Sequence, residues 1–153
     1  MAGTGPGQSG TSTAVLCKVT RSVAYNLVNA AVTAFPWDAE EDDDLGFHDN
    51  VTQNTRLTVP AGQGGWYLVQ GCLASAGAIT SRFLVTVRKN GSDIKGATSE
   101  LVGSGSGSPA LPFSAVVELA ATDYIDVSYY QDSGSVKATE VGKVGCSLIK
   151  LGS

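Results

Sequence analysis

The feature that most constrains this chain is a series of short apolar segments, each closed by turn-forming residues, between Ala14 and Leu151. In Ser81–Lys89 the side chains alternate, so that Phe83, Val85 and Val87 share one face. A period of two residues is typical of a β-strand with one buried side. No segment has a convincing helical spacing of apolar residues, so the sequence predicts an all-β fold.

The remaining segments are expected to form further strands of the same kind. The predicted strands are Val15–Val19, Ala31–Phe35, Arg56–Val59, Trp66–Ala74, Phe113–Leu119, Tyr124–Gln131 and Val144–Leu151. Asn90-Gly91 is a hairpin dipeptide that turns the chain into a strand around Ile94. The Gly-Ser run Gly103–Pro109 is expected to be a surface loop at one end. About ten short antiparallel strands at this spacing predict a jelly-roll β-sandwich.

The chain is expected to form one domain preceded by an arm. Its 153 residues suit a single domain, residues 14–153, that buries a core without disulfide bonds. Met1–Thr13 is rich in Gly, Ser and Thr and cannot fold alone, so it is expected to be a flexible N-terminal arm. The arm lacks the basic and apolar regions of a secretory signal. No apolar run approaches the roughly 20 residues that a membrane helix needs.

Charge is unevenly distributed along the chain. The net charge is −4, but six of the fourteen acidic residues lie within Asp38–Asp44, which is interpreted as an acidic loop. Outside that segment eight acidic residues face ten basic ones, so the rest is almost neutral. Because no basic stripe is present to neutralise phosphates, nucleic acid is not an expected partner.

The acidic segment raises one metal hypothesis. Ca²⁺ takes six to eight oxygen ligands, and Asp42, Asp44 and Asp49 could supply several of them. Their spacing is not that of an EF-hand loop, and the alternative is a solvated run of charges. Calcium is the one cofactor that the sequence suggests.

Residues that could carry catalysis are few. Cys17, Cys72 and Cys146 are odd in number and far apart, which argues against a disulfide framework and a Cys-x-x-Cys motif and favours free thiols. His48-Asp49 could begin a hydrolytic triad, but no Gly-x-Ser-x-Gly elbow accompanies it, so His48 is expected to be hydrogen-bonded in a loop. No phosphate loop or dinucleotide fingerprint is present. We predict that the protein is not an enzyme.

The order of three segments resembles the tumour necrosis factor (TNF) and complement globular-head jelly roll, in its phage or bacterial form. These segments are Val59–Gly62 leading through Gly65 into Trp66–Val69, Val85–Gly91, and Val117–Val127. The segment from Asp38 to Asp49 is similar to a loop of phage-type members. The chain departs from the family at Thr122, where Gly usually precedes Asp, and in Val144–Leu148, which lacks the aromatic residues of the animal proteins.

The resemblance implies a homotrimer, because members of the family generally place one face of the inner sheet around a three-fold axis. On the central strand Tyr67 and Val69 would then face the core. The residues expected to face the axis are Trp66, Leu68, Gln70, Cys72, Val116 and Glu118. The alternative is a monomer whose second face is covered by loops, but closed symmetry is the common solution for such a surface.

Two functions are compatible with this pattern. The first is a structural virion protein, a trimeric phage capsid decoration or fibre-head module whose Met1–Thr13 arm binds a capsid or other virion protein, with no membrane partner. The alternative is a receptor- or carbohydrate-binding adhesin module of a phage tail fibre or a bacterial surface. Its candidate ligand contacts are Trp37, Phe47 and Tyr130, since exposed aromatic rings stack on sugars. These rings could equally be packing residues.

Overall fold

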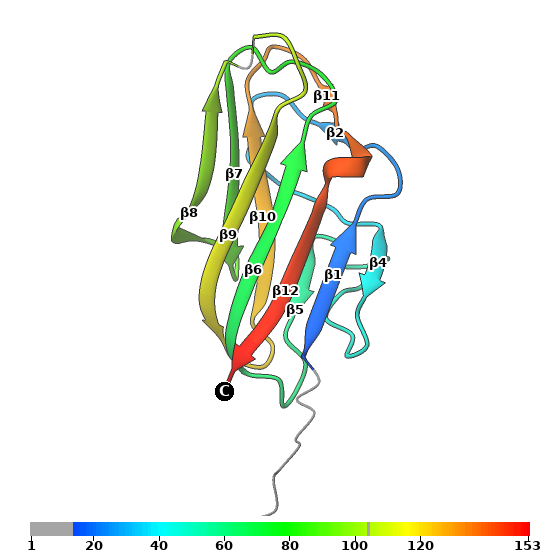
Figure 1. Ribbon diagram of the computed structural model, residues 1–153, viewed down its shortest axis with the longest axis vertical. Helices are drawn as coiled ribbons and strands as arrows, with labels where there is room; N and C mark the ends of the chain where they lie inside the picture. Colours follow the sequence, from blue (N-terminus) through cyan, green and yellow to red (C-terminus); the bar gives the residue numbers. More distant parts are fainter. Residues whose placement is uncertain (1–13, 104) are drawn as a thin grey trace, which may run out of the picture.

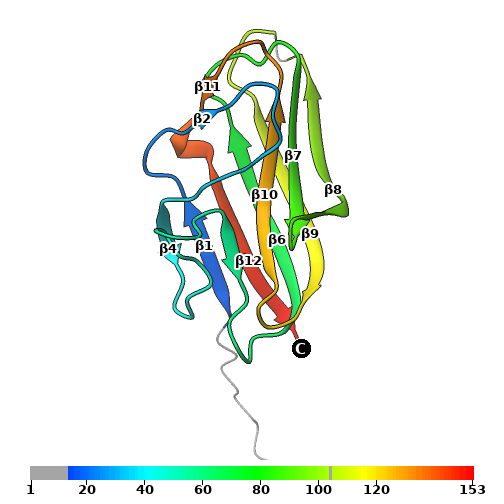
Figure 2. The ribbon, with the colours of Figure 1, turned by 180° about the vertical axis from the view of Figure 1, so that it is seen from behind.

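The computed structural model describes residues 14–103 and 105–153, and these form two sheets packed face to face (Figures 1 and 2). The first sheet has the order β4 (Ala39–Asp42), β1 (Leu16–Thr20), β12 (Gly145–Gly152), β6 (Gly65–Ala74) and β9 (Ala110–Leu119). The second has the order β3 (Thr33–Ala34), β10 (Tyr124–Gln131), β7 (Arg82–Lys89) and β8 (Ser92–Val102), with β5 (Arg56–Thr58) also paired to β10. A small separate ladder joins β2 (Asn26–Leu27) to β11 (Lys137–Ala138), and a 3₁₀ turn, η1, covers Val141–Lys143.

All strand pairs are antiparallel, and the predicted jelly-roll sandwich is confirmed. Every predicted strand forms, although the ends shift by a few residues, as strand ends generally do. The predicted arm, Met1–Thr13, lies outside the described residues.

The alternation in β7 produces the core as expected. Phe83, Val85 and Val87 are fully buried, as are Tyr67 and Val69 of β6 across the sandwich. Since burying a large apolar side chain contributes about 1.5–3 kcal/mol, this two-sided contact is the main source of stability.

The acidic segment is not a loop throughout, which corrects the sequence interpretation. Ala39–Asp42 forms the edge strand β4 and pairs with β1. An edge strand needs only one neighbour, so Glu41 and Asp42 remain exposed, and Glu41 forms an ion pair with Lys18 of β1. Charged edges also resist pairing with the edges of other molecules.

The β7–β8 hairpin and the turn before β10 support each other at one end of the sandwich. Asn90 and Gly91 both have positive φ, 50° and 79°, as a type I′ turn requires. The Asn90 side chain donates to Asp123 Oδ1 at 2.8 Å and accepts from the backbone N–H of Tyr124 at 2.9 Å. The hairpin dipeptide therefore also fixes the start of β10.

Candidate functional site

The outward side of the first sheet, called here the open face, carries all six residues predicted to face a three-fold axis. In the β6–β9 register Trp66 lies opposite Glu118 and Leu68 lies opposite Val116. Gln70 and Cys72 follow on β6 at the same two-residue spacing. Trp66 is 46% exposed and Val116 is 58% exposed. These side chains share one face of the sheet, opposite the core; that they face a three-fold axis stays a prediction.

One half of the open face is apolar. A cross-strand row runs from Val116 through Leu68 and Ile149 to Leu16, and Trp66 lies in the next row. Sequence reasoning missed Ile149 and Leu16. The signal that could have found Ile149 is the presence of apolar residues on both sides of Val144–Leu151, which is typical of a strand covered on both faces.

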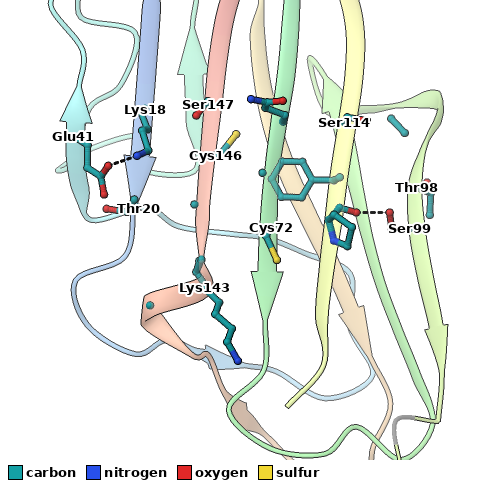
Figure 3. Close-up of a pocket in the computed structure, with 18 of the residues that line it drawn as sticks. Lys18, Thr20, Glu41, Cys72, Thr98, Ser99, Ser114, Lys143, Cys146 and Ser147 are labelled. Carbon is teal, nitrogen blue, oxygen red and sulfur yellow. Dashed lines mark hydrogen bonds and ion pairs between the residues drawn. The ribbon is translucent and has the colours of Figure 1, made fainter. Parts of the chain in front are cut away.

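The other half is a groove of about 840 Å³ with both polar and apolar walls, which crosses the sheet from β8 to β4 (Figure 3). Its walls carry hydroxyl, amide and thiol groups, and its lysines are paired. Lys18 contacts Glu41, and Lys143 Nζ lies 3.0 Å from a carboxylate oxygen of Glu140. The charges of the groove are thus largely balanced within the chain.

The thiols are poor nucleophiles. Cys17, Cys72 and Cys146 are free, as expected. Burial raises the pKa of the Cys146 thiol to about 12, and it also raises the pKa of Cys17. Cys72 lies in the groove near Lys143; burial raises the pKa of its thiol, and the lysine only partly opposes this. Since the thiolate is the reactive form, these cysteines are unsuited to catalysis at neutral pH.

His48 has a structural role. Its buried ring places Nδ1 2.9 Å from Glu40 Oε1 and Nε2 3.1 Å from the carbonyl oxygen of Asn54. Both ring nitrogens are thereby engaged, and the ring ties β4 to the following loop. The prediction of a hydrogen-bonded loop histidine is confirmed.

The three candidate calcium ligands are not brought together. The Asp49 carboxylate accepts hydrogen bonds from the backbone of Val51 and Thr52 and from the Thr52 hydroxyl, which lower the pKa of Asp49. Asp42 lies on β4, and Asp44 follows that strand. Within residues 14–103 and 105–153, no group of three or more His, Cys, Asp or Glu side chains is placed to share a metal ion. The Asp49 carboxylate therefore serves local structure.

Two of the three predicted ligand aromatics are buried, which corrects the sequence interpretation. Trp37 is 1% exposed and packs edge-on against Phe35, with ring centroids 4.8 Å apart. Phe47 is 2% exposed and packs against Tyr67 at 6.1 Å. Both rings fill the core and cannot stack on a sugar. Tyr130 alone remains half-buried on the outer side of β10.

Comparison with known proteins defines the fold more closely than the function. No known protein-family profile matches the chain, and no curated protein sequence matches it. Solved structures do match. Eiger TNF from S. frugiperda has a TM-score of 0.63 at 14% identity, over 92% of this chain and 94% of that one. The globular domain of zebrafish complement 1qA has a TM-score of 0.65 at 11% identity, over 90% and 97%. Murine APRIL has a TM-score of 0.62 at 14% identity, over 90% and 99%.

The resemblance read from the sequence is therefore confirmed at the level of the fold, which is the TNF-like jelly roll. The phage or bacterial type stays a prediction. The described part of the chain contains no helix long and apolar enough to cross a membrane.

Proposed function

We propose that this TNF-like jelly roll is a non-enzymatic structural module that assembles into a homotrimer through its open face. The observation that carries the proposal is the exposed apolar half of that face. Trp66 and Val116 lie in adjacent rows and each leaves about half of its side chain in water. Leu68 and Ile149 are half-buried beside them. Contiguous exposed apolar surface on a sheet marks an interaction site.

A closed ring of copies accounts for the shape of this surface. The apolar row Val116–Leu68–Ile149–Leu16 runs across β9, β6, β12 and β1, so it spans the face rather than one edge. Copies that turn this face toward a common axis bury it completely and leave no free patch. Three-fold symmetry is what the resemblance to the TNF and complement family implies.

The finer proposal is a trimeric virion protein, a capsid decoration or fibre-head module of a phage, located in the virion. Leu16 at the start of β1 pairs with Ile149 near the end of β12, so the beginning of β1 and the C-terminus lie at one end of the domain (Figure 1). A trimer would then present three arms from the same end, which suits attachment to a particle surface. Segments of this composition can order on a partner when they bind.

The first test is the mass of the purified protein in solution, measured by light scattering after gel filtration. We expect three times 15.6 kDa for the full chain. Val116→Asp should yield monomers, because it puts a charge into the apolar half of the open face. Val32→Asp is the matched control, since Val32 is 66% exposed and lies away from this face. A monomeric wild-type chain at high concentration would refute the trimer.

The second test addresses the arm. A chain lacking Met1–Thr13 should still form the trimer, because the described domain holds the whole open face. The same chain should fail to attach to phage particles that the full chain decorates. Attachment without the arm would refute the anchoring role.

An adhesin is the second candidate, and Tyr130 favours it. This ring is partly exposed, and the Arg82 guanidinium lies 5.9 Å from its centroid, so a polar and an aromatic group are presented together. Binding to a glycan array that is lost in Tyr130→Ala would support the adhesin; no binding by the wild-type trimer would argue against it.

A further inference from the structure

The two edges of the open face differ in shape and charge. At one edge lies β4, whose Glu40, Glu41 and Asp42 are followed by Asp43 and Asp44. At the other edge lies β9, beside the first residues of β8. There a lysine, Lys95, is exposed and makes no ion pair with any of the described residues.

Lys95 stands on a projecting bulge. Thr86 pairs with Thr98, but Arg88 pairs with Asp93, so the four residues Ile94–Ala97 lie opposite one residue of β7. Figure 1 shows the start of β8 turning away from β7 at this point. A bulge of this size lifts the chain out of the sheet and re-aims its side chains.

The bulge and β9 together form a notch at the free edge of the first sheet. The notch, about 260 Å³, is lined by Leu68, Ser114 and Val116 as well as the bulge. Pro112 has no N–H, so it forms a non-hydrogen-bonded pair with Cys72, and its backbone groups point away from β6 toward the free edge of β9. Because the two kinds of pair alternate, the backbone groups of Ser114 and Val116 also point to this free edge. No described strand pairs with β9 on that side.

The acidic edge and the lysine lie at the same height along the sheet. One cross-strand row runs from Asp42 through Lys18, Ser147 and Gln70 to Ser114. Ser114 lines the notch together with Lys95. Rotation about an axis parallel to the strands keeps this height, so it can bring the lysine of one copy level with the acids of the next.

We propose that, in the assembled ring, the Ile94–Ala97 bulge of one copy docks against the β4 edge of the next copy, with Lys95 facing Asp42 and Asp44. The inference rests on the proposed self-association through the open face. A cyclic ring that points this face toward its axis sets the β9 edge of each copy beside the β4 edge of its neighbour. Lys95 carries a charge opposite to that of the β4 edge, so this order is favoured over a contact between two β4 edges, whose like charges would repel.

The test is a charge swap measured by sedimentation equilibrium. Lys95→Glu should raise the dissociation constant of the trimer by about two- to fivefold for each contact between copies. Over the three contacts of the ring this amounts to about 10- to 100-fold. The double variant Asp42→Lys, Asp44→Lys should weaken the trimer similarly. The triple variant, which combines both changes with Lys95→Glu, should recover most of the lost affinity between the copies. Higher salt should weaken the wild type and affect Lys95→Glu less, because salt screens exposed charges. Lys137→Glu, the same charge change on β11, is the matched control.

The outcomes separate the two proposals. A wild-type trimer whose dissociation constant is unchanged in Lys95→Glu overturns the edge contact and leaves the trimer standing. Failure of the triple variant to recover, with unchanged circular dichroism and melting, overturns the pairing of Lys95 with Asp42 and Asp44. A wild type that is monomeric at every concentration overturns the trimer and the edge contact with it.

Discussion

Thr122 occupies a backbone conformation that favours glycine. Its φ is +74°, and the backbone N–H of Asp123 donates to the carbonyl oxygen of Ala120 at 3.1 Å. These features describe a type II turn with Thr122 at its third position, where φ must be positive. The same residue is where the sequence departs from the glycine usual in the TNF and complement family, so the departure leaves a strained β-branched residue in the turn.

Replacing Thr122 with glycine should stabilise the fold. An L-residue in the left-handed region costs about 1–2 kcal/mol, while glycine costs about 0.5–1 kcal/mol through the entropy of the unfolded chain. Thr122 is exposed, so little packing is lost. The net gain in unfolding free energy is about 0.5–1 kcal/mol, or roughly 1–4 °C in melting temperature for a chain of this size.

The assay is urea unfolding of Thr122→Gly and wild type at one protein concentration, since self-association makes stability depend on concentration. Ala121→Gly is the matched control in the same turn. Ala121 does not have a positive φ, so this change should destabilise by about 0.5–1 kcal/mol. The reasoning is refuted if Thr122→Gly and Ala121→Gly lose stability equally. Backbone strain at residue 122 would then not determine whether glycine raises or lowers the free energy of unfolding.

Two further predictions concern Asp123, in the same turn as Thr122, and Gly71 on β6. Hydrogen bonds from the Asn90 side chain, Lys89 and the Ala120 N–H lower the pKa of Asp123 to about 2. Because the pKa of Asp123 is lower in the folded state, its ionised carboxylate stabilises the fold. This stabilisation is present above the unfolded pKa of about 3.9 and is lost as the pH falls from there to about 2. Unfolding free energy measured from pH 5 to 2 should therefore fall less steeply in Asp123→Asn, and equal slopes would contradict it. Gly71→Ala should destabilise by about 1–3 kcal/mol or more in thermal unfolding, since a Cβ there would lie 2.1 Å from the Gly145 carbonyl oxygen. A melting temperature equal to that of wild type would show that β6 and β12 can separate at no cost.

Local sequence determined the strands and the hairpin turn. The alternation of Phe83, Val85 and Val87 places those side chains in the core whatever lies opposite, because successive residues of a strand point to opposite sides. Asn90 and Gly91 specify the turn type by themselves, because both residues accept positive φ. The same alternation separates Tyr67 and Val69 from Trp66 and Leu68 on β6, but the family resemblance was needed to assign which of these two faces meets the core.

Long-range contacts decided the rest. Trp37 and Phe47 have no alternating neighbours to show their direction, and they are buried because Phe35 and Tyr67 meet them across the fold. The acidic Ala39–Asp42 becomes a strand because β1 offers it an edge, which no propensity of its own residues predicts. The row from Asp42 to Ser114, and thus the notch with Lys95 at its end, depends on the register of five strands from distant parts of the chain. Register is set by tertiary packing, because a slip of one residue would turn every side chain of a strand to the other face.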